Sequence, residues 1–128
     1  MLGDSITAGY GLNPTEAYPA LLQAKIDAAG LSFEIVNAGV SGDTTSGGLR
    51  RVDWALSRGA DVLIVALGGN DGLRGISPKQ TESNLTGIVQ KARAKSPGIS
   101  IIIAGMQMPA NMGPQYTAEF QAVFSKVA

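Results

Sequence analysis

A serine near the start of the chain stands in a run of small residues, because residues 2–10 read LGDSITAGY. A serine at the carboxyl end of a strand can act as a nucleophile when a base removes its proton and backbone N–H groups face the developing oxyanion. The same string also fits a strand-to-helix turn in which Ser5 is simply the helix N-cap. Ser5 is therefore a candidate nucleophile, and the structural alternative stays open.

A second run of small and polar residues covers residues 37–45, NAGVSGDTT. Gly42 could present an unobstructed amide to an anion, while Asp43 and Thr44 could cap the helix that follows. A phosphate-binding loop is one alternative, although the run has neither the lysine of a P-loop nor a G-x-G-x-x-G pattern. A purely structural turn is another.

The third run, residues 67–72, reads LGGNDG and follows the most apolar stretch of the chain. Asn70 offers a side-chain N–H donor that works at any pH, although asparagine is also common in left-handed turns. The second and third runs follow apolar segments, the first lies at what would be the carboxyl end of a strand, and strands of a parallel sheet end at one edge. We therefore expect Ser5, Gly42 and Asn70 to form one site.

Three apolar runs rich in β-branched residues predict the strands that position these loops. They are Phe33–Val36, Val62–Leu67 and Ile99–Ala104. Continuous apolar strands are typical of a parallel sheet covered on both faces, and parallel neighbours need helical crossovers. The pattern predicts a three-layer α/β/α fold.

Amphipathic segments between these runs predict four helices. They are expected over about Ala17–Ala29 with Gly30 as the C-terminal cap, over Ser46–Ser57, from Ser77 to about Ser96, and from Pro114 to the end of the chain. In the third of these, Ser77 and Gln80 have the spacing of a capping box. Apolar residues recur on one face of each segment at helical spacing.

Composition narrows the classes of function. The chain has 128 residues, of which 45% are hydrophobic and 16% charged, and we expect a single domain over residues 1–128. Its net charge of zero argues against nucleic-acid partners, and no apolar run is long enough for stable membrane insertion. Because the chain has no cysteine and no histidine, thiolate catalysis, histidine-bound metals and the usual base for a serine nucleophile are all excluded.

Taken together, Gly3-Asp4-Ser5, Gly39–Asp43 and Gly68–Asp71 resemble three sequence blocks of the SGNH (GDSL) hydrolase family, in the family's order. The likeness is greatest to its bacterial thioesterase, lysophospholipase and arylesterase branch, and extends to residues 73–75 (LRG) and 108–111 (MPAN). The resemblance implies a flavodoxin-like SGNH fold and hydrolysis of small carboxylic esters or thioesters through an acyl-serine. It also implies no cofactor, and a periplasmic or secreted location.

The resemblance assigns roles to individual positions. Ser5 resembles the nucleophile, and its own amide, the Gly42 amide and the Asn70 side chain resemble the oxyanion hole. The loop Gly72–Ser77 resembles the mobile edge of an acyl groove. The substrate-binding positions that the resemblance implies are Asp4, Gly72, Leu73, Gln107, Met108 and Pro109.

One block of the family has no counterpart here, namely the Asp-x-x-His segment in which histidine activates the serine. The lysines lie on predicted helices away from the loops, so a Ser-Lys arrangement is rejected. We expect a partial domain that is inactive as given, poorly stable, short of most of its first strand and lacking its last. An exposed sheet edge should favour non-native self-association. The alternatives are a noncatalytic acyl- or carbohydrate-binding relative and a flavodoxin-like module that binds a phosphate ligand.

Overall fold

A parallel sheet of four strands organises the structure, a computed structural model that describes residues 1–128. All neighbouring strands pair in parallel, in the order β2-β1-β3-β4. The strands are β1 (Leu2–Gly3), β2 (Ala38–Gly39), β3 (Val62–Ala66) and β4 (Ser100–Ile103). The parallel pairing confirms the predicted α/β fold class.

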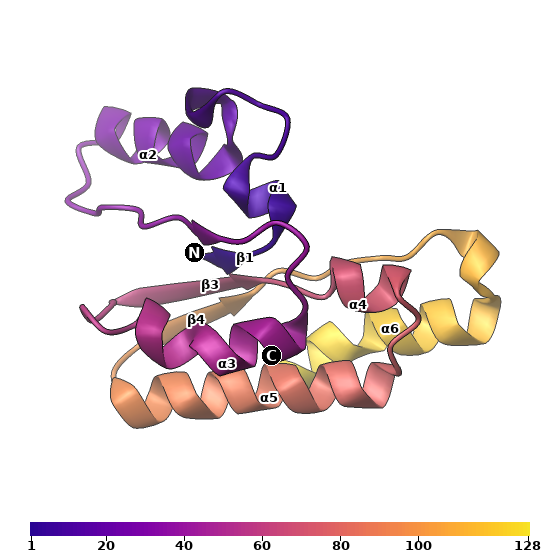
Figure 1. The fold of residues 1–128 in the computed structure, drawn as a ribbon. Helices are drawn as coiled ribbons and strands as arrows, with labels where there is room; N and C mark the ends of the chain where they lie inside the picture. Colours follow the sequence, from indigo (N-terminus) through magenta and orange to yellow (C-terminus); the bar gives the residue numbers. More distant parts are fainter.

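Helices cover the sheet from two sides (Figure 1). α3 and α5 lie on one side, and α1 and α2 lie on the other, next to β1. The helices are α1 (Ser5–Ala8), α2 (Tyr18–Ala28), α3 (Thr45–Ala55), α4 (Gly69–Leu73), α5 (Pro78–Lys95) and α6 (Pro114–Val127), with 3-10 turns η1 (Pro14–Glu16) and η2 (Ala110–Met112). The four helices predicted from the sequence are confirmed to within a few residues.

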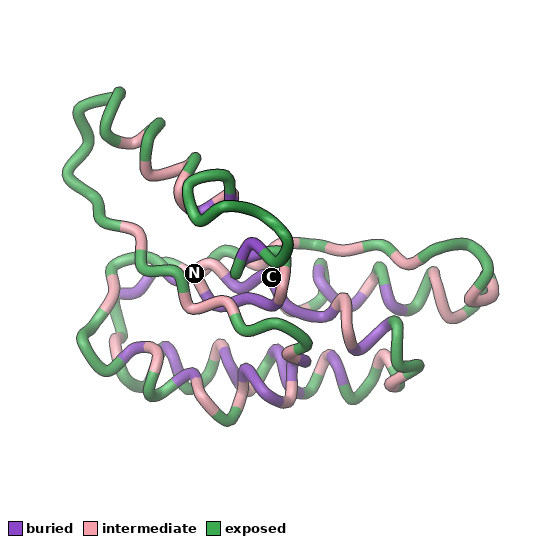
Figure 2. Tube along the Cα trace, turned by 45° about the horizontal axis from the view of Figure 1, so that its top comes forward, coloured by how far each residue is buried: buried purple, intermediate pink, exposed green.

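The core lies between one face of the sheet and helices α3, α5 and α6. Alternate residues of β3 and the residue after it point into this layer. The buried side chains there include Leu63, Val65, Leu67, Leu85, Ile88, Phe120 and Val123. Figure 2 shows that burial is concentrated in this part of the molecule, whereas in α2 only Pro19 is buried.

Helix α5 begins almost as the sequence predicts. The hydroxyl of Ser77 accepts a hydrogen bond of 3.1 Å from the amide of Gln80. The return bond of a capping box is not made, because the Gln80 side chain instead donates to Asn84 Oδ1 at 3.1 Å. The helix ends at Lys95, before Pro97, as expected.

The predicted strand Phe33–Val36 is wrong, since β2 is confined to Ala38–Gly39. The reason is the shortness of its neighbour, because β1 offers only Leu2 and Gly3 as partners. The segment before β2 is held by other groups, including the side chain of Gln23, which bonds to the carbonyl of Phe33 and the amide of Ile35 at 2.9 and 2.6 Å.

β1 is nevertheless the central strand next to β2 and β3, and it pairs with both. Only Leu2 and Gly3 pair there, so Val62, Leu63 and Ile64 of β3 have no partner in β1. β4 forms one edge of the sheet, and Ile102 on it is 52% exposed. None of the helices is both long and apolar enough to cross a membrane.

Candidate active site

The three candidate loops leave the sheet at one edge. Gly3 lies opposite Gly39 on one side and Ala66 on the other, so the three strands end level with one another. Because the strands are parallel, the residues that follow them emerge on the same side of the sheet. The structure thus brings together the three loops that carry Ser5, Gly42 and Asn70.

Ser5 is the first residue of α1 and is half-buried. The N-cap is Asp4, whose carboxylate accepts a hydrogen bond of 3.0 Å from the amide of Ile6. The reading of Ser5 as a simple N-cap is therefore wrong. With the cap supplied by its neighbour, the Ser5 hydroxyl is not required for helix capping.

Two glycines allow α1 to lie directly against the strand ends. A Cβ atom on Gly3 would overlap the side chain of Thr7, and one on Gly39 would overlap the backbone of Ala8. The close approach of α1 to β1 and β2 thus depends on residues without side chains. This packing fixes the position of Ser5 relative to the carboxyl ends of β1 and β2.

Polar contacts hold the other end of α1. The hydroxyls of Thr7 and Tyr18 share a hydrogen bond of 2.6 Å. The Asn37 side chain donates to the Thr7 carbonyl at 2.8 Å, and its oxygen accepts from the Gly39 amide at 2.9 Å. Helix α2 and strand β2 both therefore anchor the helix that carries Ser5.

The loop of Gly42 turns through a left-handed conformation, with φ of 79° at that glycine. Gly42 itself is exposed. Thr44 is the N-cap of α3, as predicted, and its hydroxyl accepts from the Gly47 amide at 3.2 Å. Glycine is suited to this position because residues with side chains rarely adopt such a backbone conformation.

Helix α4 and its C-cap residue hold two successive carbonyls of this loop. The Asn70 side chain donates to the carbonyl of Asp43 at 2.9 Å, and Arg74 donates to the carbonyl of Gly42 at 2.9 Å. Asparagine has two N–H hydrogens, so one remains for a ligand. The second and third loops therefore form one connected unit.

Arg51 is a site-supporting residue that sequence reasoning missed. Its guanidinium donates to Asp43 Oδ2 at 2.7 Å, to the Ala38 carbonyl at 2.7 Å and to the Gly3 carbonyl at 2.9 Å. The ion pair with Asp43 is largely buried, with 18% and 11% of the two side chains exposed. One arginine thus ties the ends of β1 and β2 to the Gly42 loop.

The residues predicted to bind substrate fall into different environments. Leu73 on α4 is 67% exposed, whereas Asp4 is 2% exposed and serves as the helix cap. Met108 packs on Gly72 so closely that a Cβ atom on that glycine would overlap it. Pro109 is exposed and precedes η2.

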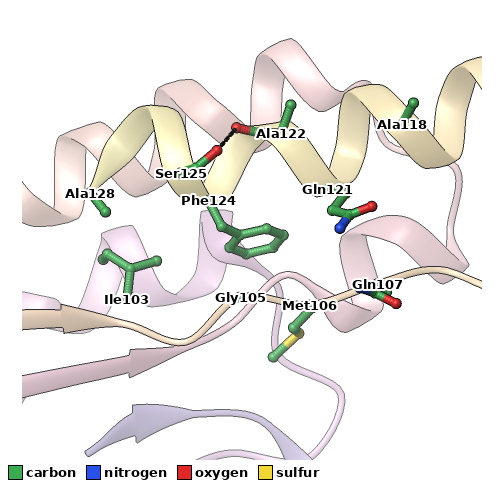
Figure 3. A pocket seen from close by; sticks show the side chains of 10 residues that line it. All are labelled: Ile103, Gly105, Met106, Gln107, Ala118, Gln121, Ala122, Phe124, Ser125 and Ala128. Carbon is green, nitrogen blue, oxygen red and sulfur yellow. Dashed lines mark hydrogen bonds between the residues drawn. The ribbon is translucent and has the colours of Figure 1, made fainter.

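Gln107 lies in a separate groove of about 660 Å³ between α6 and the segment after β4 (Figure 3). Phe124 and Met106 also line it, and the ring of Phe124 lies over the loop that contains Gly105 (Figure 3). Ser5, Gly42 and Asn70 are not among the residues that line this groove. The groove is therefore distinct from the three-loop site.

The electrostatics near the site include a tyrosine with a shifted pKa. Burial, together with the negative charge of Asp71, raises the pKa of Tyr116 above its ordinary value of 10.0. The Tyr116 hydroxyl donates to the carbonyl of Ile76 at 2.7 Å, which ties α6 to the loop after α4.

A serine at a strand-to-helix junction of a parallel sheet, beside a glycine loop and an asparagine amide, is the arrangement of a serine hydrolase of the α/β type. Comparison with known proteins specifies the family. The model of the GDSL-like Lipase/Acylhydrolase family matches residues 1–128, and the chain belongs to this family, the SGNH hydrolases.

Individual proteins are similar to this chain in sequence and in structure. The chain is 43% identical over 129 aligned residues to Esterase TesA of Pseudomonas aeruginosa, and 40% identical to Thioesterase 1/protease 1/lysophospholipase L1 of Escherichia coli K12. It also superimposes on the crystal structure of AlinE4, an SGNH-hydrolase family esterase, with a TM-score of 0.93 and 42% identity.

These matches cover the chain but only part of each relative. All of this chain aligns with 63% of the Pseudomonas protein and 60% of the Escherichia protein. The match to AlinE4 covers 99% of this chain and 68% of that one. The chain therefore spans about 60% of the length of the curated relatives.

Proposed function

We propose that the protein to which these residues belong hydrolyses carboxylic esters or thioesters, with Ser5 as the nucleophile. The observation that carries this proposal is the level ending of β1, β2 and β3, which brings the Ser5, Gly42 and Asn70 loops to one edge. Similarity to proteins named as an esterase and as a thioesterase supports the same reaction class.

In the proposed reaction, the Ser5 oxygen attacks the acyl carbon and a base takes the hydroxyl proton. The carbonyl oxygen becomes an oxyanion, which the Gly42 amide, the Asn70 side chain and the Ser5 amide stabilise. The leaving alcohol or thiol takes up the proton as the intermediate collapses to an acyl-serine. Water then attacks the acyl-serine, releases the acid and restores the serine.

The base must come from outside these 128 residues, because the chain contains no histidine. We propose that it comes from the Asp-x-x-His block of the family, and that this chain alone does not turn over ester at a practical rate. Binding and the oxyanion hole would leave about 10³–10⁴-fold acceleration over the reaction in water, as in enzymes whose triad is broken.

The acyl chain is proposed to lie over the exposed side chain of Leu73 and along the segment that follows β4. Met108 packs on Gly72 at that place, so α4 and this segment are in contact. Pro109 would extend the same surface, whereas Gln107 lines the separate groove beside α6. Groove shape would then set the preferred acyl length, whereas the oxyanion chemistry is common to all esters and thioesters.

The test compares this chain with an extended protein, defined as the same residues lengthened at both ends to carry an Asp-x-x-His segment. Hydrolysis of p-nitrophenyl butyrate by the extended protein, lost in Ser5→Ala, would support the proposal. A folded extended protein that hydrolyses no ester would contradict it and favour a noncatalytic binding role. Tight binding of a nucleotide or flavin would instead favour the phosphate-ligand alternative.

A further inference from the structure

Asp71 is fully buried, with 0% of its surface exposed, and no cation pairs with it. Its Oδ1 accepts from the Thr45 amide at 2.8 Å. Its Oδ2 accepts from the hydroxyls of Thr45 and Thr81 at 2.5 and 3.2 Å. A buried carboxylate destabilises the folded state unless hydrogen-bond donors replace the water that it loses, and three donors do so here.

The three donors come from the first turns of two different helices. Thr45 is the first residue of α3, and Thr81 lies in the first turn of α5. The Thr45 hydroxyl also accepts a hydrogen bond of 3.0 Å from Asn84, which fixes its proton toward Asp71. The amino termini of helices favour negative charge, and two of them face this carboxylate.

Asp71 is also the last of three points at which the α4 segment holds the loop before α3. Arg74 binds the carbonyl of Gly42, Asn70 binds the carbonyl of Asp43, and Asp71 binds the amide of Thr45. The first two contacts are at least partly exposed to solvent, whereas the Asp71 contact is buried. The Asp71 contact is therefore the one shielded from water, and it ties α4 to the first residue of α3.

We propose that Asp71 is a positioning residue, which holds the Gly42 amide and the Asn70 side chain at the spacing that an oxyanion requires. This inference rests on the proposed function. Asp71 does not touch the substrate and acts through its neighbour Asn70 and through Thr45. A carboxylate accepts all three hydrogen bonds as they stand, whereas an asparagine would present an N–H₂ group at one position, so that the threonine hydroxyls there would have to rotate and accept.

Kinetics of the extended protein on p-nitrophenyl butyrate test this role. Asp71→Asn should lower kcat about 10- to 100-fold with KM within about twofold, because misplaced donors weaken only transition-state binding. Asp53→Asn is the control, since Asp53 lies exposed on α3 and reaches only Lys91, at 3.8 Å. It should leave both constants unchanged.

A double-mutant cycle distinguishes positioning from general damage. In the Asn70→Ala background, Asp71→Asn should lower kcat by no more than about threefold, because one of the two groups that it positions is already gone. The proposal would be overturned if Asp71→Asn lowered kcat as much in the Asn70→Ala background as in the wild type. A folded Asp71→Asn variant with wild-type kcat would also overturn it. If the extended protein without any substitution hydrolysed no ester, that result would instead count against the proposed function.

Circular dichroism establishes whether Asp71→Asn folds. If it does not, Thr81→Val and Thr81→Ser decide, because they remove and retain one hydroxyl donor to the carboxylate. Thr81→Val should lower kcat about three- to tenfold, in line with the loss of one hydrogen bond, and Thr81→Ser should restore it. Equal kcat values for these two variants would overturn the proposal.

Discussion

The side-chain amide of Asn70 donates a hydrogen bond of 2.9 Å to the carbonyl oxygen of Asp43. The bond fixes the orientation of the amide, because its nitrogen must face the loop and its second N–H must point elsewhere. An oxyanion donor gains from such preorganisation, since no rearrangement is needed when charge develops. The loop that carries Gly42, the other proposed oxyanion donor, therefore holds the Asn70 amide in a fixed orientation.

Removal of this donor should affect the rate far more than substrate binding. In the extended protein, Asn70→Ala should lower kcat for p-nitrophenyl butyrate about 10²–10³-fold, the usual effect of losing one oxyanion-hole donor. Asp53→Asn, at an exposed position on α3, is the control and should have wild-type activity. A folded Asn70→Ala variant with more than about half the wild-type kcat would contradict the assignment.

Gly42→Ala should reduce both stability and activity. Space is available, since the nearest atom to an added Cβ would be the Arg74 side chain at 3.8 Å. The cost is conformational, about 1–2 kcal/mol of the free energy of unfolding, because φ is 79°.

Gly59→Ala is the control that separates the loss of stability from the loss of activity. Gly59 also has a positive φ, of 77°, and nothing lies within 4 Å of an added Cβ. Urea denaturation should show similar losses of stability for both variants. Only Gly42→Ala should also lower kcat. Equal kcat values for the two variants would mean that the Gly42 amide has no special role.

The raised pKa of Tyr116 predicts a dependence of stability on pH. The folded state holds the phenol proton more tightly than the unfolded state, so this contribution is present below the ordinary pKa of 10.0 and is lost as the pH rises through the folded value. Tyr116→Phe also removes the hydrogen bond to Ile76, at a cost of about 0.5–1.5 kcal/mol at neutral pH.

Urea denaturation of both proteins between about pH 8 and pH 11 measures this contribution. The stability difference between wild type and Tyr116→Phe should shrink at the alkaline end, because only the wild type loses the contribution of the phenol. A difference that stays constant over that range would show that the Tyr116 proton is not linked to folding.

The edge strand β4 predicts self-association of the 128-residue chain. An unpaired strand edge beside the exposed Ile102 can pair with a second copy. Ile102→Lys should shift sedimentation velocity profiles toward monomer. Trp54→Lys, which alters a 74% exposed residue on α3, should not. A chain that stays monomeric at high concentration would rule out the edge as an interface.

The grouping of the site could be predicted from the sequence because it depends on topology. Parallel strands end at one edge, so the loops after β1, β2 and β3 had to meet wherever the strands began. Helices α3, α5 and α6 were also predictable, since their apolar periodicity matches the faces that now pack in the core, as at Val52, Leu85 and Phe120.

The features that could not be predicted depend on strand pairing and on contacts between distant parts of the chain. Phe33–Val36 has the composition of a strand, but a strand needs a partner and β1 is only two residues long. Arg51 reaches the Gly3 carbonyl across 48 positions of sequence, and Asp71 reaches Thr45 across 26. A carboxylate directly after Asn70 was visible in the sequence, but its burial was not.

Fluorophosphonate labelling of the extended protein, with the modified residue located by mass spectrometry, tests whether Ser5 is an activated nucleophile. A fluorophosphonate reacts with a serine only when its hydroxyl is activated and an oxyanion site receives the phosphoryl oxygen. A single adduct on Ser5 is expected, and it should be absent from Ser5→Ala and from the unextended chain. An adduct on another serine, or none on a folded extended protein that hydrolyses ester, would contradict the assignment of Ser5 as the nucleophile.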